Sequence, residues 1–148
     1  MKQALHILAT AALLLWPSVA SAQMVVHSVS VTTDASGDAT VYSPPTFGTV
    51  VAIRYVPHAT TPLDGTADIT VTDNGTGLPI LTITNTAIVA RTWFPRAFVV
   101  STTGADALFA ASGTNVLDLV PVAGAIKAVI AQGGNAKSGT LYFYVQGR

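Results

Sequence analysis

Hydrophobic and polar residues alternate along much of the chain, in short runs. Residues 29–33 read VSVTT and residues 68–72 read DITVT. Successive side chains of a β-strand point to opposite faces, so a period of two is typical of a strand with one buried face. Eight runs are predicted to be strands on this basis or on an apolar, β-branched composition: residues 29–33, 39–42, 49–56, 68–72, 80–84, 98–101, 125–131 and 140–146.

Turn-forming residues separate these runs. Asp73-Asn74-Gly75 joins the fourth and fifth runs, and Asn-Gly is a strong signal for a type I′ hairpin, in which both residues take positive φ. Residues 106–111 are a candidate for one helical turn. Many short strands at regular spacing predict an all-β fold, a single antiparallel β-sandwich of jelly-roll-like type with about eight strands.

The first 22 residues have a different pattern. Lys2 precedes an apolar stretch over residues 4–16, and Ala20-Ser21-Ala22 places small residues where a signal peptidase reads the chain. This order is typical of a signal peptide, and the apolar run is shorter than the ~20 residues of a membrane-spanning helix. We expect cleavage after Ala22, leaving residues 23–148 as one exported domain. The alternative is an uncleaved membrane anchor.

Composition narrows the possible partners. The chain has no cysteine, so an exported domain of this length depends on core packing without disulfides. Beyond the leader, six Lys and Arg stand against seven Asp. So few charges protect poorly against association, which favours an assembly. Nucleic-acid binding needs clustered cations, so we expect no nucleic-acid partner, and no membrane contact after cleavage. The six cations are scattered: Arg54, Arg91, Arg96, Lys127, Lys137 and Arg148.

Two histidines beyond the leader, His27 and His58, are candidate metal ligands. Zinc sites usually begin with a close pair of ligands, and neither His has a second His or a Cys within five residues. We interpret both as ordinary polar positions. No metal and no cofactor are expected.

Acidic residues form no catalytic pattern either. Asp34 and Asp38 flank a loop that lacks the further acids of a calcium-binding EF-hand, so an Asp-capped turn is the simpler interpretation. A predicted strand separates Asp68 from Asp73 by about 17 Å. Nucleophile-elbow, P-loop and dinucleotide-binding motifs are missing from the sequence. The sequence therefore predicts no catalytic residues and no enzymatic activity.

Aromatic residues gather at two places. Trp93 and Phe94 open a dense cluster, and residues 142–144 place Tyr on one face of the last strand and Phe on the other. A two-layer sandwich covers only one face of a strand. Tyr and Trp are also common in interfaces, because they bury a large area and keep a polar tip. Trp93, Phe94, Tyr142 and Tyr144 are therefore the candidate interface of a homo-oligomer. The alternative is an ordinary core with a tyrosine edge.

Four segments resemble small β proteins encoded among the structural genes of tailed bacteriophages and prophages. They read DASGDATVYSPPTFGTVVAIRYVP, DGTADITVTDNGTGLPILTIT, FPRA and VLDLVPVAGAIKAVIAQGGNAKSGTLYFYV, and they cover most of residues 34–145. The resemblance implies a virion component on the head or tail surface, and it carries no residue of known chemical role. The leader departs from this pattern, because virion parts assemble in the cytoplasm, and it leaves room for a secreted bacterial relative.

The sequence as a whole predicts a non-enzymatic structural or assembly protein, a phage-like virion surface component. The alternative is an exported bacterial binding module: an adhesin, a pilin-like subunit or a carbohydrate-binding domain. Residues 23–33 alternate and could extend a neighbour's sheet edge. Gly147, however, stands where pilin-like subunits carry an aromatic residue. The expected location is the periplasm, the extracellular space or a surface assembly, and the virion if the phage resemblance holds.

Overall fold

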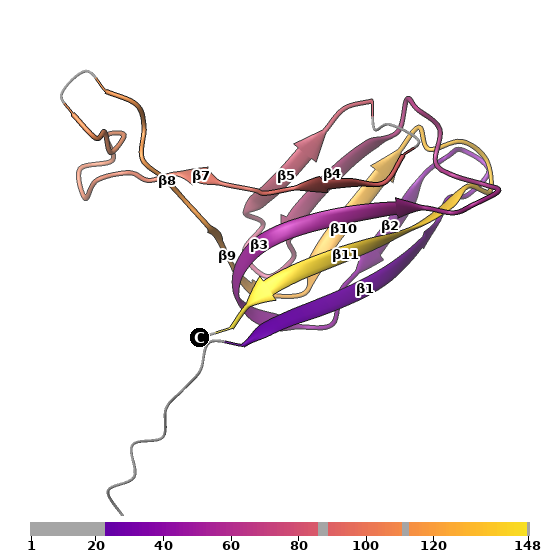
Figure 1. Ribbon diagram of the computed structural model, residues 1–148, viewed down its shortest axis with the longest axis horizontal. Coiled ribbons are helices and arrows are strands. Elements are labelled where there is room, and N and C mark those ends of the chain that lie inside the picture. The colour runs from indigo at the N-terminus through magenta and orange to yellow at the C-terminus, as the bar shows by residue number, and fades with distance from the viewer. Residues whose placement is uncertain (1–22, 86–88, 111–112, 148) are drawn as a thin grey trace, which may run out of the picture.

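The computed structural model describes residues 23–85, 89–110 and 113–147. These residues form eleven β-strands, and every strand pair is antiparallel (Figure 1). They contain no helix, and hence none that is long and apolar enough to cross a membrane. The strands are β1 (Met24–Thr32), β2 (Ala39–Tyr42), β3 (Thr46–Pro57), β4 (Asp68–Asp73), β5 (Pro79–Ile83), β6 (Arg91–Trp93), β7 (Ala97–Phe98), β8 (Leu117–Asp118), β9 (Val120–Gly124), β10 (Ile126–Ala131) and β11 (Ser138–Gln146).

Two large sheets hold nine of these strands. One has the order β1-β11-β3-β6, with β9 also paired to β3, and the other has the order β2-β10-β4-β5. The first strand pairs with the last over its whole length, from Met24 opposite Gln146 to Thr32 opposite Ser138. The segment that could have extended a neighbour's sheet is therefore used on one side within its own.

The core lies between the two sheets, and the period of two determines which residues enter it. Exposure alternates without interruption along β4 and β10 and along β11 as far as Val145, with every second residue buried. Fully burying a large apolar side chain stabilises a fold by roughly 1.5–3 kcal/mol. The largest side chains in this core are Tyr55, Phe143, Ile53, Leu63, Ile69, Ile126, Ile130 and Leu141.

The edge strand beside β3 is interrupted by a long insertion. β6 pairs with the later half of β3, where Trp93 lies opposite Ile53, and β9 pairs with the earlier half, where Val120 lies opposite Val50. Both run antiparallel to β3, so they are two pieces of one strand line. We call residues 94–119, which lie between them, the arm, and the rest of residues 23–147 the body. The arm carries the short sheet β7-β8 and projects away from the body (Figure 1).

Three details differ from the expectations. The described chain has eleven strands in three sheets rather than about eight, because three short strands that were not predicted, β6, β8 and β9, form on either side of the sixth predicted run, residues 98–101, which falls in the arm. The described part of residues 106–111 is not helical. The type I′ turn is wrong: Asn74 and Gly75 do not take positive φ. Asp73 N–H instead donates to Leu78 across a four-residue loop, and Gly77 takes the positive φ, at 74°.

Candidate functional site

The two histidines have different environments. His27 is on β1, in register with the buried Phe143, and its Nε2 is buried without a hydrogen-bond partner. His58 follows β3, and its Nδ1 accepts the backbone N–H groups of Thr60 and Thr61 at 3.4 and 3.3 Å. In residues 23–85, 89–110 and 113–147, no group of three or more His, Cys, Asp or Glu side chains could hold a metal ion.

Three of the carboxylates either accept hydrogen bonds from backbone N–H groups or pair with a nearby cation. Asp34 Oδ1 accepts the N–H groups of Ser36 and Asp38 at 2.8 and 3.0 Å, as expected of an Asp-capped turn. Asp68 Oδ1 accepts the N–H of Asn85 at 3.0 Å. Asp64 lies 3.3 Å from the Lys137 ammonium, a partly exposed pair of small energetic value.

Asp73 is the one fully buried carboxylate of the described chain. It ends β4 and closes the following loop, where Thr76 Oγ1 donates to it at 2.6 Å and the N–H of Gly75 at 3.3 Å. Burial acts to raise the pKa of Asp73, but these hydrogen bonds outweigh it and hold the pKa below its usual range. The ionised carboxylate thus accepts hydrogen bonds that stabilise the turn.

The four predicted interface aromatics do not form one patch. Tyr142 and Tyr144 alternate with the buried Phe143 on β11, so they share the outer face of their sheet and are half-buried there. Trp93 is opposite Ile53 and packs against the core from the inner side. Phe94 begins the arm and is 65% exposed.

The arm has regular hydrogen bonds but little burial. Val99 N–H donates to Val116, Val116 N–H to Ala107, and Ala107 N–H to Val99, at 2.8–3.0 Å, so three backbone segments close a ring. Several large apolar side chains of the arm nevertheless remain exposed to solvent. The exposed ones are Phe94 (65%), Phe98 (64%), Val100 (57%), Leu108 (40%), Phe109 (77%) and Leu117 (51%).

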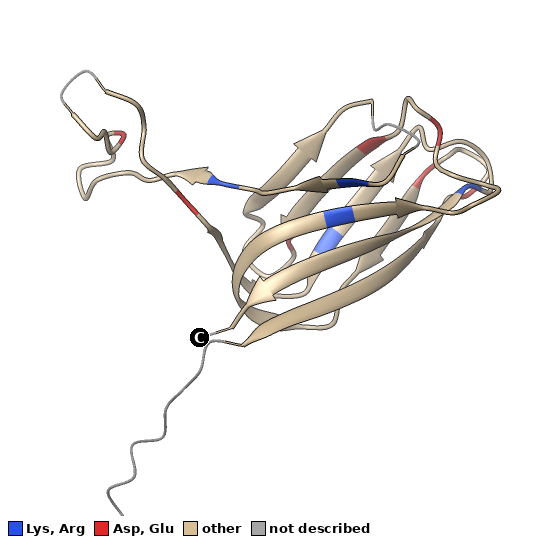
Figure 2. Cartoon of the chain, in the orientation of Figure 1, with Lys and Arg blue, Asp and Glu red and all other residues tan. Residues whose placement is uncertain are grey.

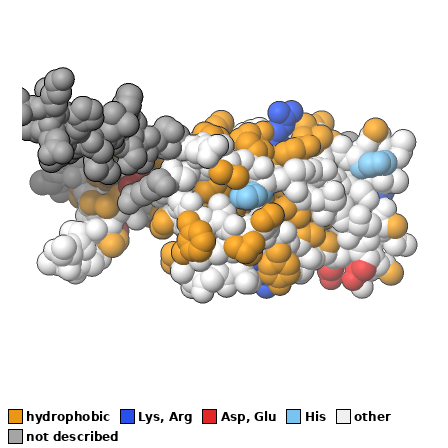
Figure 3. Space-filling view, turned by 90° about the horizontal axis from the view of Figure 1, so that it is seen from below, with side chains coloured by type: hydrophobic (Ala, Val, Ile, Leu, Met, Phe, Trp, Pro, Cys, Tyr) orange, Lys and Arg blue, Asp and Glu red, His pale blue; other side chains and the backbone are white. Residues whose placement is uncertain are grey.

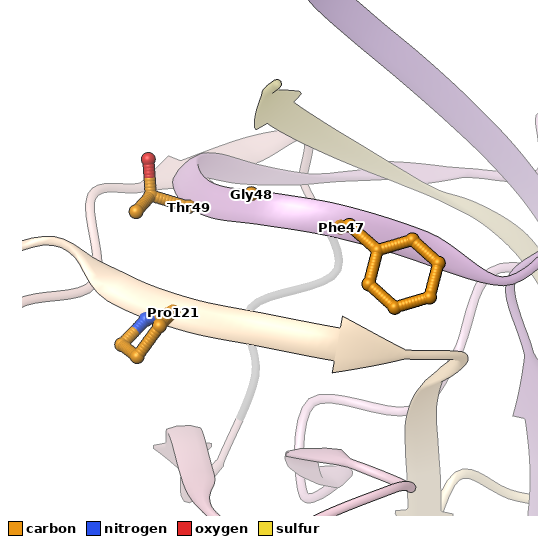
Figure 4. Close-up of a pocket in the computed structure, with 4 residues that line it drawn as sticks. All are labelled: Phe47, Gly48, Thr49 and Pro121. Atoms are coloured by element: carbon orange, nitrogen blue, oxygen red, sulfur yellow. The ribbon is translucent and has the colours of Figure 1, made fainter. Parts of the chain in front are cut away.

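A second apolar surface lies on the body at the root of the arm. Phe47 of β3 and Pro121 of β9 line a shallow hollow of about 340 Å³ together with Gly48 and Thr49 (Figure 4). Phe47 is 71% exposed. We call this surface the Phe47 hollow. In a view of the body turned by 90°, hydrophobic side chains spread over the visible face with few charges among them (Figure 3).

The positive charges do not gather on one element. The described cations lie on β3, on β6, ahead of β7, on β10 and ahead of β11 (Figure 2). The sequence interpretation missed Phe47, Phe109 and Leu117 as surface residues, because apolar side chains are normally assigned to the core. For Phe109 and Leu117 the available signal was the weak alternation of residues 99–119, which predicts no buried face for this segment.

Comparisons with known proteins add little to this description. No protein-family model matches the chain, and no curated protein matches it. Among solved structures, the chain is similar to a crystal structure of FlhE, with 9% sequence identity and a TM-score of 0.41, covering 85% of this chain and all of that one.

Proposed function

We propose that this protein is a non-enzymatic structural or assembly subunit that functions as a homo-oligomer, of the phage-like virion surface type. The observation that carries the proposal is the apolar surface left outside the core, concentrated on the arm and the Phe47 hollow. Large apolar side chains that gather in this way on the outside of a soluble protein are typical of protein interaction sites. The low charge of the whole chain supports the same conclusion.

The architecture proposed for this subunit is a jelly-roll-like sandwich. If β6 and β9 are taken as one strand line, each large sheet has four strands, and the chain passes repeatedly from one sheet to the other. The first strand then lies beside the last, as two interleaved Greek keys require. Jelly rolls occur in viral capsid proteins and in lectins, so the architecture is compatible with both the proposed function and its alternative.

The alternative is an exported binding module, and two features favour it. Strand β1 pairs only with β11, so the other edge of this uncharged nine-residue strand could take up an extended peptide. A hollow of about 310 Å³ near His58 is also lined by hydroxyl groups, which suit a carbohydrate. These hydroxyls belong to Ser30, Thr32, Ser138 and Thr140.

Light scattering at micromolar concentration, coupled to size exclusion, tests the oligomer. We expect a monodisperse species of two or more copies, and a monomer at every concentration would refute the proposal. Fractionation of the native host separates the two functions. A virion component is recovered with particles banded in a density gradient, whereas an exported module is recovered from the periplasm or the medium.

A further inference from the structure

The arm and the Phe47 hollow are two apolar surfaces on the same chain, and neither is covered by the other. Residues 94–119 contain three charges, Arg96, Asp106 and Asp118, among 26 residues. The most exposed large apolar side chain of the described residues, Phe109 at 77%, lies in the arm, between β7 and β8 along the chain. The second most exposed, Phe47 at 71%, lies on the body.

We propose that the arm of one copy binds the Phe47 hollow of a second copy, so that copies join through two different surfaces. This inference rests on the proposed function and specifies which surfaces form the contact between copies in the homo-oligomer. Phe109 and its neighbours Phe98 and Leu117 supply the inserted side chains, and Phe47 and Pro121 supply the receiving surface. Such a contact closes either as a pair of copies that exchange arms or as a ring.

The exposed area is sufficient for a stable contact. A phenylalanine buries roughly 150–250 Å². Three phenylalanines and three aliphatic side chains, exposed to the extent seen on the arm, therefore offer on the order of 600 Å². A standard interface buries about 800 Å² on each partner. In a pair of copies that exchange arms, each copy buries both its own arm and its own Phe47 hollow, so the two surfaces together approach this area. The hydrogen-bonded ring of Val99, Ala107 and Val116 holds the arm in one shape, which lowers the entropy lost on binding.

Other occupants fit the arm less well. A membrane surface attracts basic segments, whereas two of the three charges of the arm are acidic. The body of the same copy does not cover the arm, which projects away from it (Figure 1). A second copy provides an apolar hollow of about 340 Å³ lined by an exposed Phe and a Pro.

Three variants of the complete domain, residues 23–148, test the contact by sedimentation equilibrium. Phe109→Ser changes the arm and Phe47→Ser changes the hollow. Leu78→Ser is the matched control, because Leu78 is 46% exposed on neither surface. We expect the arm and hollow variants each to weaken self-association at least tenfold. The control should associate like the wild type, and circular dichroism should show all three folded.

Mixing the two defective variants gives the most specific result. Phe47→Ser retains an intact arm and Phe109→Ser retains an intact hollow, so an equimolar mixture should form complexes that neither variant forms alone. Failure of the mixture to associate would show that the arm meets another arm or another surface, and would overturn the proposal.

The remaining outcomes separate this inference from the proposed function. If the wild type is oligomeric and Phe109→Ser does not change it, the arm contact is wrong while the oligomer stands, and the tyrosine face of β11 is the next candidate to test by substitution. If the wild type is a monomer, both fail. Flotation of the wild type with phosphatidylcholine and phosphatidylserine vesicles, lost in Phe109→Ser, would assign the arm to a membrane instead.

Discussion

Two cross-strand residue pairs, one in the body and one in the arm, differ in how much of their side chains is buried. Val71 of β4 lies opposite Ala128 of β10, and both are fully buried. Phe98 of β7 lies opposite Leu117 of β8, and they are 64% and 51% exposed. Both pairs are apolar and belong to hydrogen-bonded ladders. The body pair is covered by a second sheet, whereas the described arm has no second layer over it.

This difference shows that strand pairing and side-chain burial are separate events. A ladder satisfies the backbone, but only a packed layer removes side chains from water. The body obtains that layer from its own chain. The described arm has no such layer, and for this reason we propose that the arm functions in assembly while the body provides stability. Five predictions test the division, in order of decreasing effect on the free energy of unfolding.

Truncation of one Phe in each region should have very different effects. Phe143→Ala leaves a cavity in the core and should lower the free energy of unfolding by about 3–5 kcal/mol, or prevent folding. Phe109→Ala should change it by less than about 0.5 kcal/mol in the monomer, because the side chain is exposed. Urea unfolding below the association concentration measures both. Similar losses would show that the arm is packed onto the body in solution.

Acid should destabilise the body through Asp73. The pKa of Asp73 is lower in the folded protein than in the unfolded chain, where it is about 3.9, so its contribution is complete above that value. It is lost as the pH falls through the folded pKa. Asp73→Asn should cost about 1–3 kcal/mol near pH 7 and progressively less toward pH 2. The exposed Asp38→Asn is the control, and a pH-independent difference would contradict the assignment.

The loop after β4 should be sensitive at Gly77. A β-branched residue at φ 74° is strained, so Gly77→Val should cost about 1–2 kcal/mol. Gly77→Asn should cost much less, because Asn tolerates this region. Gly75→Ala should also destabilise, for a different reason: an added Cβ would lie 2.9 Å from the carbonyl oxygen of Ala123. Thermal melts of the three variants distinguish strain from crowding, and equal effects of Val and Asn at Gly77 would refute the strain.

Removal of the arm should leave the body folded. β6 and β9 follow one line along β3, where only Val51 and Ala52 separate the partners of Val120 and Trp93. Replacing residues 94–119 by Gly-Ser should therefore join the two strands and change the free energy of unfolding by less than about 1 kcal/mol, since the shorter loop costs less entropy. The shortened protein should be a monomer. A body that no longer folds would show that the arm is part of the core.

The smallest effect concerns the first 22 residues, which lie outside the described residues. Every described strand begins at or after Met24, so a chain that starts at Gln23 should melt at the same temperature as the complete chain. If the protein is exported and its leader is cleaved, the intact mass of the protein from the native host should correspond to a chain that begins at Gln23. Retention of Met1 would argue for assembly in the cytoplasm.

Some strands and turns of this fold could be predicted from the sequence, and others could not. The alternation of residues 68–72 predicts β4 with the correct buried face, because the pleat dictates the period, and the apolar run of residues 125–131 predicts β10 as a strand. Asn74-Gly75 failed as a turn signal because Asp73 closes a longer loop through its own side chain. The hydrogen bonds of the buried Asp73 carboxylate stabilise this loop more than the local turn preference of Asn74-Gly75 stabilises a two-residue turn.

The candidate interface residues divide in the same way. Tyr142 and Tyr144 were predicted to share one face of the last strand, opposite to that of Phe143, and they do, because alternation is a property of the strand alone. Trp93 was grouped with Phe94 as a neighbour in sequence. The structure places Trp93 against the core and Phe94 outside, since the edge strand ends between them.

The sequence by itself determined that this protein is made of antiparallel strands, which residues share a face in the alternating runs such as 68–72, and that no disulfide holds the fold together. These properties follow from a period of two residues and from composition. Only the tertiary structure decided that the first strand pairs with the last, that one edge strand is interrupted by the arm, and that Phe47 and Phe109 remain exposed. Burial depends on whether a second layer lies opposite, and residues far apart in the chain provide that layer.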